Sequence, residues 1–142
     1  MCLIVDANVA DELVLAKADA APILNWLEKR KGFIATGGKN LEELLNTGLR
    51  SFIQACLRDG RARNYSCDDL SNETTRLTNQ GAMKSDDPHV IALASKSRAR
   101  VVFTRDKPLM ADFRDRAFID QPRGSIYTKK THVALLAKCS DC

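Results

Sequence analysis

Long hydrophobic runs are missing from this sequence of 142 residues. The longest uninterrupted apolar stretches are about five residues, as at 90–94, whereas a membrane-spanning helix needs roughly 20. The N-terminus also lacks a basic leader followed by an apolar stretch, so we expect no signal peptide and a cytoplasmic location. We therefore predict a protein without a membrane segment, whose length fits one domain over residues 1–142.

Cysteine and histidine are few, and their spacing does not indicate a zinc site. Only Cys139 and Cys142 show Cys-x-x-Cys spacing, and the sequence does not define what this pair does. Five cysteines is an odd number, and in a chain without a secretory signal we expect reduced thiols. His89 and His132 have no metal-ligand spacing to each other. We expect His89 to be packed or hydrogen-bonded rather than catalytic.

Positive charge exceeds negative charge modestly, with 22 Lys and Arg residues against 18 Asp and Glu residues. Basic residues cluster at several places, for example at 29–31 and 129–130. Such clusters are usual on solvated surfaces, but they also occur where proteins bind polyanions. The charge therefore permits a nucleic-acid partner without requiring one.

Short β-rich runs alternate with longer helical stretches along the chain. This alternation predicts an α/β domain with a mainly parallel sheet. The predicted strands cover residues 2–5, 32–36, 64–67, 101–103 and 125–127. The predicted helices cover residues 21–30, 40–58, 68–80, a nearly all-apolar segment from 88, 107–114 and 132–138. The region 61–83 has the least distinct pattern.

Two of the clearest predicted strands run into an aspartate, Asp6 and Asp106. Because the carboxyl ends of parallel strands meet at one edge of a sheet, we expect these two side chains to lie near each other. Asp87 precedes Pro88 at the start of the apolar helix. An N-cap role alone explains an aspartate there, but a carboxylate at that position would also point toward the strand ends.

Several carboxylates in one crevice repel one another, and a divalent cation removes that conflict. Oxygen ligands without a nearby histidine or thiolate favour Mg²⁺ or Mn²⁺ over Zn²⁺. Such an ion can bind a phosphate oxygen, activate a water and stabilise the leaving oxygen. The predicted chemistry is therefore phosphodiester hydrolysis.

Four segments, in this order, resemble the motifs of PIN domains. Residues 3–9, Leu-Ile-Val-Asp-Ala-Asn-Val, resemble the first, and residues 41–44, Leu-Glu-Glu-Leu, resemble the second. Residues 87–94, Asp-Pro-His-Val-Ile-Ala-Leu-Ala, resemble the third, and residues 102–106, Val-Phe-Thr-Arg-Asp, resemble the fourth. The resemblance covers residues 3–113. It implies a three-layer Rossmann-like fold, with a central sheet flanked by helices, and a Mg²⁺- or Mn²⁺-dependent ribonuclease.

The resemblance also implies roles for individual residues. Asp6 and Asp87 would hold the main metal ion, Glu43 would hold it or orient its water, and Asp106 would complete the set. Many short PIN domains are the ribonuclease toxins of toxin–antitoxin modules. The implied partners are RNA, a small antitoxin protein and a second copy of the chain in a homodimer.

The second motif departs from the family, because the small residue that usually precedes its glutamate is here another glutamate. A helical wheel places Glu42 at the edge of the apolar stripe of a helix over 40–58 and Glu43 on the far side. The register of the motif favours Glu43. We take Glu43 as the predicted site residue and keep Glu42 as the alternative.

Further residues beside the motifs would support the site. Asn8 and Thr104 would position carboxylates or phosphate by hydrogen bonding. The basic side chains next to the motifs would be the first phosphate contacts. These are Lys39, Lys84, Arg105 and Lys107.

Three other functions fit parts of the pattern. A haloacid-dehalogenase-type phosphatase also begins with a strand and an aspartate, but it needs a second aspartate where this chain has Asn8. A non-catalytic PIN-like module would bind RNA or a protein, although all four carboxylate positions are filled here. Structure-specific DNA nucleases use a similar site, but they carry extra helical regions for which 142 residues leave no room.

Overall fold

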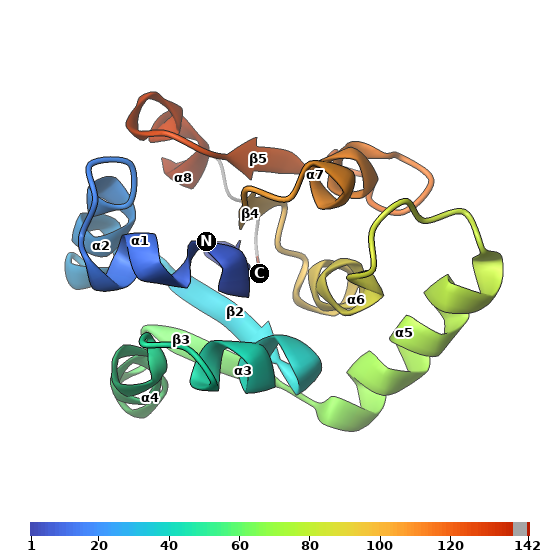
Figure 1. The fold of residues 1–142 in the computed structure, drawn as a ribbon, viewed down its shortest axis with the longest axis horizontal. Coiled ribbons are helices and arrows are strands. Elements are labelled where there is room, and N and C mark those ends of the chain that lie inside the picture. Colours follow the sequence, from blue (N-terminus) through green and yellow to red (C-terminus); the bar gives the residue numbers. More distant parts are fainter. Residues whose placement is uncertain (138–141) are drawn as a thin grey trace.

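The computed structural model describes residues 1–137 and 142. Its centre is a sheet of five strands in the order β3-β2-β1-β4-β5, and every neighbouring pair is parallel (Figure 1). The strands are β1 (Cys2–Val5), β2 (Phe33–Gly37), β3 (Ala62–Tyr65), β4 (Val101–Phe103) and β5 (Ser125–Tyr127). The predicted α/β fold with a parallel sheet is confirmed.

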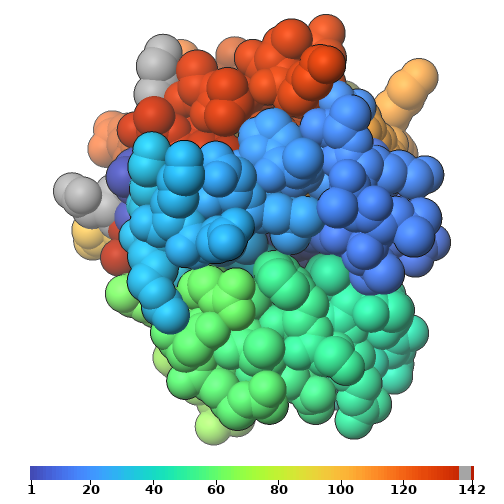
Figure 2. Space-filling view, turned by 90° about the vertical axis from the view of Figure 1, so that its left-hand side faces the viewer, coloured from blue at the N-terminus to red at the C-terminus, as the bar shows by residue number. Residues whose placement is uncertain are grey.

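Helices cover both faces of the sheet and give three layers. One face carries η1 (Ala7–Val9), α1 (Ala10–Val14), α2 (Ala21–Glu28), α3 (Gly38–Leu45), α4 (Arg50–Asp59), η2 (Lys130–His132) and α8 (Ala134–Ala137). The other carries α5 (Cys67–Gln80), α6 (Pro88–Ser97) and α7 (Lys107–Arg114). Figure 2 shows the first face, where α1 and α2 lie between the green surface of α3 and α4 and the orange-red C-terminal segments.

Strand β1 shows how the sequence produces these layers. Leu3 and Val5 pack on the side of α1 and α2, whereas Cys2 and Ile4 pack on the side of α6. Side chains alternate along a strand, so a strand that is apolar at every position must be covered on both faces. Complete burial of an aliphatic side chain of this size contributes roughly 1.5–3 kcal/mol. β1 is therefore fixed at the centre of the sheet.

The long helix predicted over 40–58 is wrong, because the chain forms two helices, α3 and α4. Thr47 interrupts the pattern: its hydroxyl donates to the Leu44 carbonyl at 2.6 Å and accepts from the Leu49 amide at 3.1 Å. A hydroxyl that bonds the local backbone competes with the helical hydrogen bonds, and Gly48 follows directly. Gly60 ends α4 in the left-handed region.

Other boundaries differ by smaller amounts. The segments η1 and α1 were not predicted, because 7–14 is too short to show a helical period. The strand expected at 64–67 lies at Ala62–Tyr65. The helix expected at 132–138 is divided between η2 and α8, and Lys138 lies outside the described residues.

The prediction of reduced thiols is wrong for one pair, because a disulfide joins Cys2 to Cys142. Cys56 is buried and free, and Cys67 is exposed and free. Cys139, the other member of the Cys-x-x-Cys pair, lies outside the described residues. Spacing alone did not indicate this bridge, because its partners are 140 positions apart and meet only in the folded chain.

The strand order places a topological switch point between β1 and β4. From β1 the sheet grows through β2 to β3 on one side, and through β4 to β5 on the other. In open parallel sheets, ligands bind outside the carboxyl ends of the strands at such a point. In the part of the chain that the structure describes, no helix combines the length and apolar character needed to cross a bilayer.

Candidate active site

Asp6 follows β1 directly at the switch point, and its side chain is 5% exposed. The hydroxyl of Thr104 donates to Asp6 Oδ2 at 2.7 Å and accepts from the Asp106 amide at 3.1 Å. Burial raises the pKa of Asp6, the Thr104 hydrogen bond opposes that shift, and the charges of Glu43 and Asp106 add to it. One threonine hydroxyl therefore connects the two strand-end aspartates, which agrees with the positioning role that the PIN resemblance implies for Thr104.

Asp106 lies beyond β4 and begins α7 as its N-cap. Its Oδ1 accepts from the Leu109 amide at 3.3 Å. Because this bond occupies one carboxylate oxygen, the other remains available to the crevice. The prediction that Asp6 and Asp106 lie near each other is consistent with their shared partner Thr104 and with the effect of Asp106 on the pKa of Asp6.

Asp87 occupies the predicted N-cap position of α6, but its side chain makes no capping hydrogen bond. Helix capping therefore does not explain why an aspartate stands here. Burial raises the pKa of Asp87 to about 6, with further contributions from Asp6, Asp106 and Glu43. These effects place all four predicted carboxylates within electrostatic range of one another.

The segment before Asp87 is held by a buried carboxylate from α7. Asp112 is 2% exposed and accepts hydrogen bonds from the Lys84 amide at 3.0 Å and the Ser85 amide at 2.8 Å. Sequence reasoning missed Asp112, because nothing in its local pattern separates it from the exposed acids of a surface helix. It is a positioning residue for the loop that carries Asp87.

Glu43 faces the cluster, whereas Glu42 is exposed. The wheel assumed one long helix with a leucine stripe, but the buried residues of α3 are Asn40 and Leu44. Residues 40 and 44 define a face that lies opposite Glu42 and beside Glu43. The structure therefore brings Glu43, the residue favoured by the motif register, toward Asp6 and Asp87.

Asn40 fixes α3 against the sheet. The Thr36 hydroxyl donates to Asn40 Oδ1 at 2.7 Å, and Asn40 Nδ2 donates to the Val5 carbonyl at 2.9 Å. All three groups are buried, and the last lies next to Asp6. This pair of bonds sets the position of Glu43, one helical turn later, relative to the end of β1.

Replacing Asn40 by alanine is expected to destabilise the protein by about 1–3 kcal/mol, because it leaves buried polar groups without partners. Urea unfolding measures the change. Asn46→Ala is the matched control, since Asn46 is exposed at the end of the same helix. An Asn40→Ala variant as stable as the control would contradict this role.

His89 is the residue that sequence reasoning undervalued. It lies in the first turn of α6, is 6% exposed, and neither ring nitrogen has a hydrogen-bond partner among the described residues. Nε2 lies 3.4 Å from Glu43 Oε2 and 4.0 Å from Asp87 Oδ1. Of the two expected arrangements, packing or a hydrogen bond, the described structure shows packing alone. The side chain instead completes a compact group.

The group formed by Glu43, Asp87 and His89 can hold a metal ion, since its ligand atoms all lie within 4.8 Å of one another. Asp6 and Asp106 do not belong to this compact group, although both were predicted as ligands. They lie near enough to raise the pKa of Asp87. The described residues thus provide two carboxylates and an imidazole at the centre, with two more carboxylates nearby.

The other predicted supporting residues differ in availability. Asn8 is exposed and accepts from the Arg105 amide at 3.4 Å, rather than bonding a carboxylate. The Arg105 guanidinium is engaged by Glu12 at 2.8 Å and by Asp19 at 3.6 Å, so it is not free to meet a phosphate. The remaining predicted basic side chains are exposed. These are Lys39, Lys84 and Lys107.

A polar hollow of about 320 Å³ opens beside His89, between α3, α5 and the start of α6. Its rim includes Gly37, where an added Cβ would lie 2.6 Å from the Tyr65 carbonyl oxygen, so only glycine fits. Its polar lining combines hydroxyls and one ammonium group with the Asp86 carboxylate and the His89 ring. The lining side chains include Lys39, Ser71, Thr74 and Thr75.

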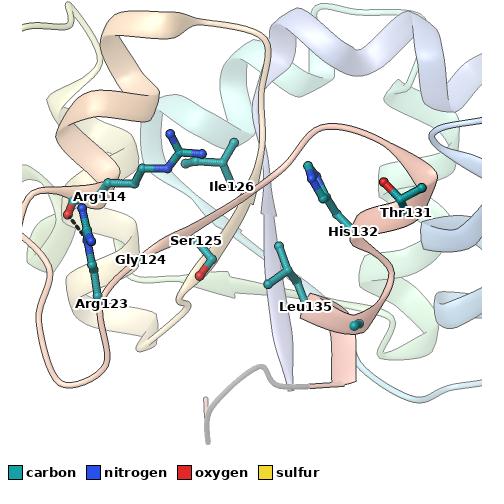
Figure 3. Close-up of a pocket in the computed structure, with 9 residues that line it drawn as sticks. Arg114, Arg123, Gly124, Ser125, Ile126, Thr131, His132 and Leu135 are labelled. Carbon is teal, nitrogen blue, oxygen red and sulfur yellow. Dashed lines mark hydrogen bonds between the residues drawn. The ribbon is translucent and has the colours of Figure 1, made fainter.

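A larger hollow, of about 580 Å³, lies along β5 and the segment that follows it (Figure 3). It contains Arg114 and Arg123, and Arg123 Nε donates to the Arg114 carbonyl at 2.7 Å. The described residues that line it include no carboxylate, so they offer no cation ligands of that kind. Because β5 is the edge strand and β4 separates it from β1, this hollow lies away from the switch point.

Comparisons with known proteins add no relative. No protein-family model matches the chain, and no curated protein matches it. The functional argument therefore depends on the site itself: carboxylates from β1, α3, α6 and α7 meet at the switch point, beside a buried imidazole and a polar hollow.

Proposed function

We propose that this protein is a metal-dependent endoribonuclease of the PIN type. The observation that supports the proposal most is the gathering of carboxylates outside the carboxyl ends of β1 and β4, where Glu43 and Asp106 act on both Asp6 and Asp87. Burial and neighbouring negative charge raise the pKa values of Asp6 and Asp87 together. Unneutralised negative charge at a ligand-binding position of the fold is the environment in which a divalent cation binds.

The residues present fit such a cation. The Asp87 carboxylate makes no capping bond, and neither ring nitrogen of His89 has a hydrogen-bond partner. Each of these two side chains therefore has a lone pair available for a cation. Glu43 is held beside them by the turn that Asn40 anchors. When bound, a divalent cation would polarise a phosphate oxygen and make a water more acidic.

The chain's own groups divide the remaining tasks. Asp6, fixed through Oδ2 by Thr104, would direct its other oxygen into the crevice, and Glu43 would orient the attacking water. In hydrolysis the water oxygen bonds to phosphorus, one phosphorus–oxygen bond to a ribose breaks, and the leaving oxygen takes a proton. Lys39 and Lys107 would contact neighbouring phosphates, and the hollow beside His89 has a size suited to a nucleotide.

RNA as the substrate comes from the resemblance to PIN domains. The same resemblance supports a toxin role, with a small antitoxin protein as partner and a homodimeric form. A cytoplasmic site of action is a further part of the proposal. A gene for a small protein directly upstream would support the toxin role. The metal proposed from the resemblance is Mg²⁺ or Mn²⁺.

The proposal is tested by incubating the purified protein with single-stranded RNA, single-stranded DNA and a phosphomonoester, each with Mn²⁺ or with chelator. We expect cleavage of RNA alone, only with the cation, and a loss of at least about 100-fold in Asp6→Asn. Asp11→Asn is the matched control, because Asp11 is an exposed acid on α1 that lines neither the site nor the hollow beside His89.

Three outcomes would contradict the proposal. Cleavage in chelator would exclude a metal-dependent mechanism. Release of phosphate from the monoester alone would indicate a phosphatase. RNA binding without cleavage under any cation would indicate a non-catalytic module.

A further inference from the structure

The most unusual group in the described structure is the imidazole of His89. It is 6% exposed, and both Nδ1 and Nε2 are buried without a hydrogen-bond partner. A buried polar atom without a partner costs about 1–3 kcal/mol. The ring is nevertheless turned so that Nε2 faces two carboxylates, at 3.4 Å from Glu43 and 4.0 Å from Asp87.

We propose that His89 Nε2 is a direct ligand of the metal ion, together with Glu43 and Asp87, and that the site selects a first-row transition-metal dication over Mg²⁺. The inference concerns the same site as the proposed function and rests on it, but it assigns a nitrogen ligand, and a preference against Mg²⁺, that the PIN resemblance does not. The resemblance implies oxygen ligands only.

The distances fit shared coordination. Ligand atoms about 2.1 Å from one ion in an octahedral arrangement lie roughly 3 Å apart when adjacent and 4.2 Å apart when opposite. The separations of Nε2 from Glu43 and from Asp87 fall within this range. The third pair also lies within 4.8 Å. Little movement is therefore needed for one ion to contact all three.

The chemistry of the ligand set decides the class of metal. Mg²⁺ strongly prefers oxygen, whereas imidazole suits ions such as Zn²⁺, Fe²⁺ and Co²⁺, and Mn²⁺ accepts mixed nitrogen and oxygen ligands. Two carboxylates balance the charge of one dication.

A hydrogen bond from His89 to Glu43 is the competing explanation for this placement. At 3.4 Å the Nε2–Oε2 contact is long for such a bond, and the orientation of the ring does not meet hydrogen-bond geometry. Lys39 Nζ lies 3.9 Å from the other oxygen of Glu43 and supplies a positive charge there already. Metal ligation accounts for the free lone pair as well as for the proximity.

Electron spin echo spectroscopy of the Mn²⁺-loaded, tag-free protein tests the assignment, because it detects nitrogen bound to Mn²⁺. The chain has two histidines. His132 is on η2, where its Nδ1 lies 3.1 Å from the Thr128 amide, and it lines the hollow along the edge strand β5. We expect an imidazole nitrogen signal in the wild type and in His132→Asn, and none in His89→Gln.

A binding titration provides the second measurement. We expect His89→Gln to weaken Mn²⁺ binding by roughly tenfold or more, and Mg²⁺ binding by less than about threefold. If His89→Gln does not fold, the wild type and His132→Asn still decide, since a signal that persists in His132→Asn must come from His89.

The outcomes separate this inference from the proposed function. Cation-dependent RNA cleavage by a protein whose bound Mn²⁺ shows no imidazole nitrogen would overturn the role of His89 and leave the nuclease intact. A nitrogen signal without RNA cleavage would support His89 as a ligand and overturn the nuclease function. Failure of the wild type to bind Mn²⁺ would overturn both.

Discussion

Replacing Glu43 by glutamine is expected to lower the rate of RNA cleavage by roughly 10²- to 10⁴-fold, while Glu42→Gln leaves it nearly unchanged. The two side chains are adjacent in sequence and chemically identical, but α3 turns Glu43 toward Asp87 and His89 and leaves Glu42 exposed. The expected contrast therefore depends only on the orientation of the helix.

Initial rates on one fluorescent single-stranded RNA, at saturating Mn²⁺, measure this contrast. Circular dichroism confirms that both variants are folded. Equal losses in the two variants would show that charge near the crevice matters rather than position, and a larger loss in Glu42→Gln would show that α3 presents its other face.

Replacing Asp87 by asparagine is expected to stabilise the metal-free protein at neutral pH while abolishing cleavage. The pKa of Asp87 is raised to about 6 by burial and by the charges of Asp6, Asp106 and Glu43, so its ionised form is destabilised in the folded state. After allowance for solvent screening, the gain is about 1–3 kcal/mol, or roughly 3–10 °C in Tm.

The pH dependence of this gain has a definite sign. The folded-state pKa of Asp87 is above the unfolded one, so its contribution to stability is complete below about pH 4 and is lost as pH rises through about 6. The asparagine side chain of the variant would be neutral throughout. The stability difference between variant and wild type is therefore largest above pH 6 and shrinks toward pH 4.

Thermal unfolding in chelator at pH 4.5 and 7.5 measures this effect, with Asp86→Asn as the control for a surface aspartate. Addition of Mn²⁺ should reverse the order at pH 7.5, because only the wild type gains binding energy. A variant less stable than the wild type in chelator at pH 7.5 would show that Asp87 is not under electrostatic strain.

The positions of the strand-end aspartates could be predicted from sequence because they depend on a local rule. Apolar β-rich runs form central parallel strands, and the residues after them lie on one edge of the sheet. Asp6 and Asp106 follow that rule, 100 positions apart, and Thr104 links them. The α/β fold could be predicted for the same reason.

The glutamate and the histidine could not be fixed in this way. The choice between Glu42 and Glu43 depended on where α3 ends, which Thr47 decides through bonds that hydrophobic periodicity does not reveal. The proximity of His89 to Glu43 depends on the packing of α3 against α6, two helices separated in sequence by α4, β3 and α5. Spacing arguments detect ligands on one element, not across two.

The most direct test of the central claim is the chemistry of the RNA ends that cleavage produces. If the carboxylates act through a cation and an attacking water, the 2′-hydroxyl is not the nucleophile. Mass spectrometry of products formed with Mn²⁺ should then find no 2′,3′-cyclic phosphate, and a single 2′-deoxy substitution at the cut site should be tolerated. Cyclic phosphate ends, or cleavage that persists in chelator or in Asp6→Asn, would contradict the account.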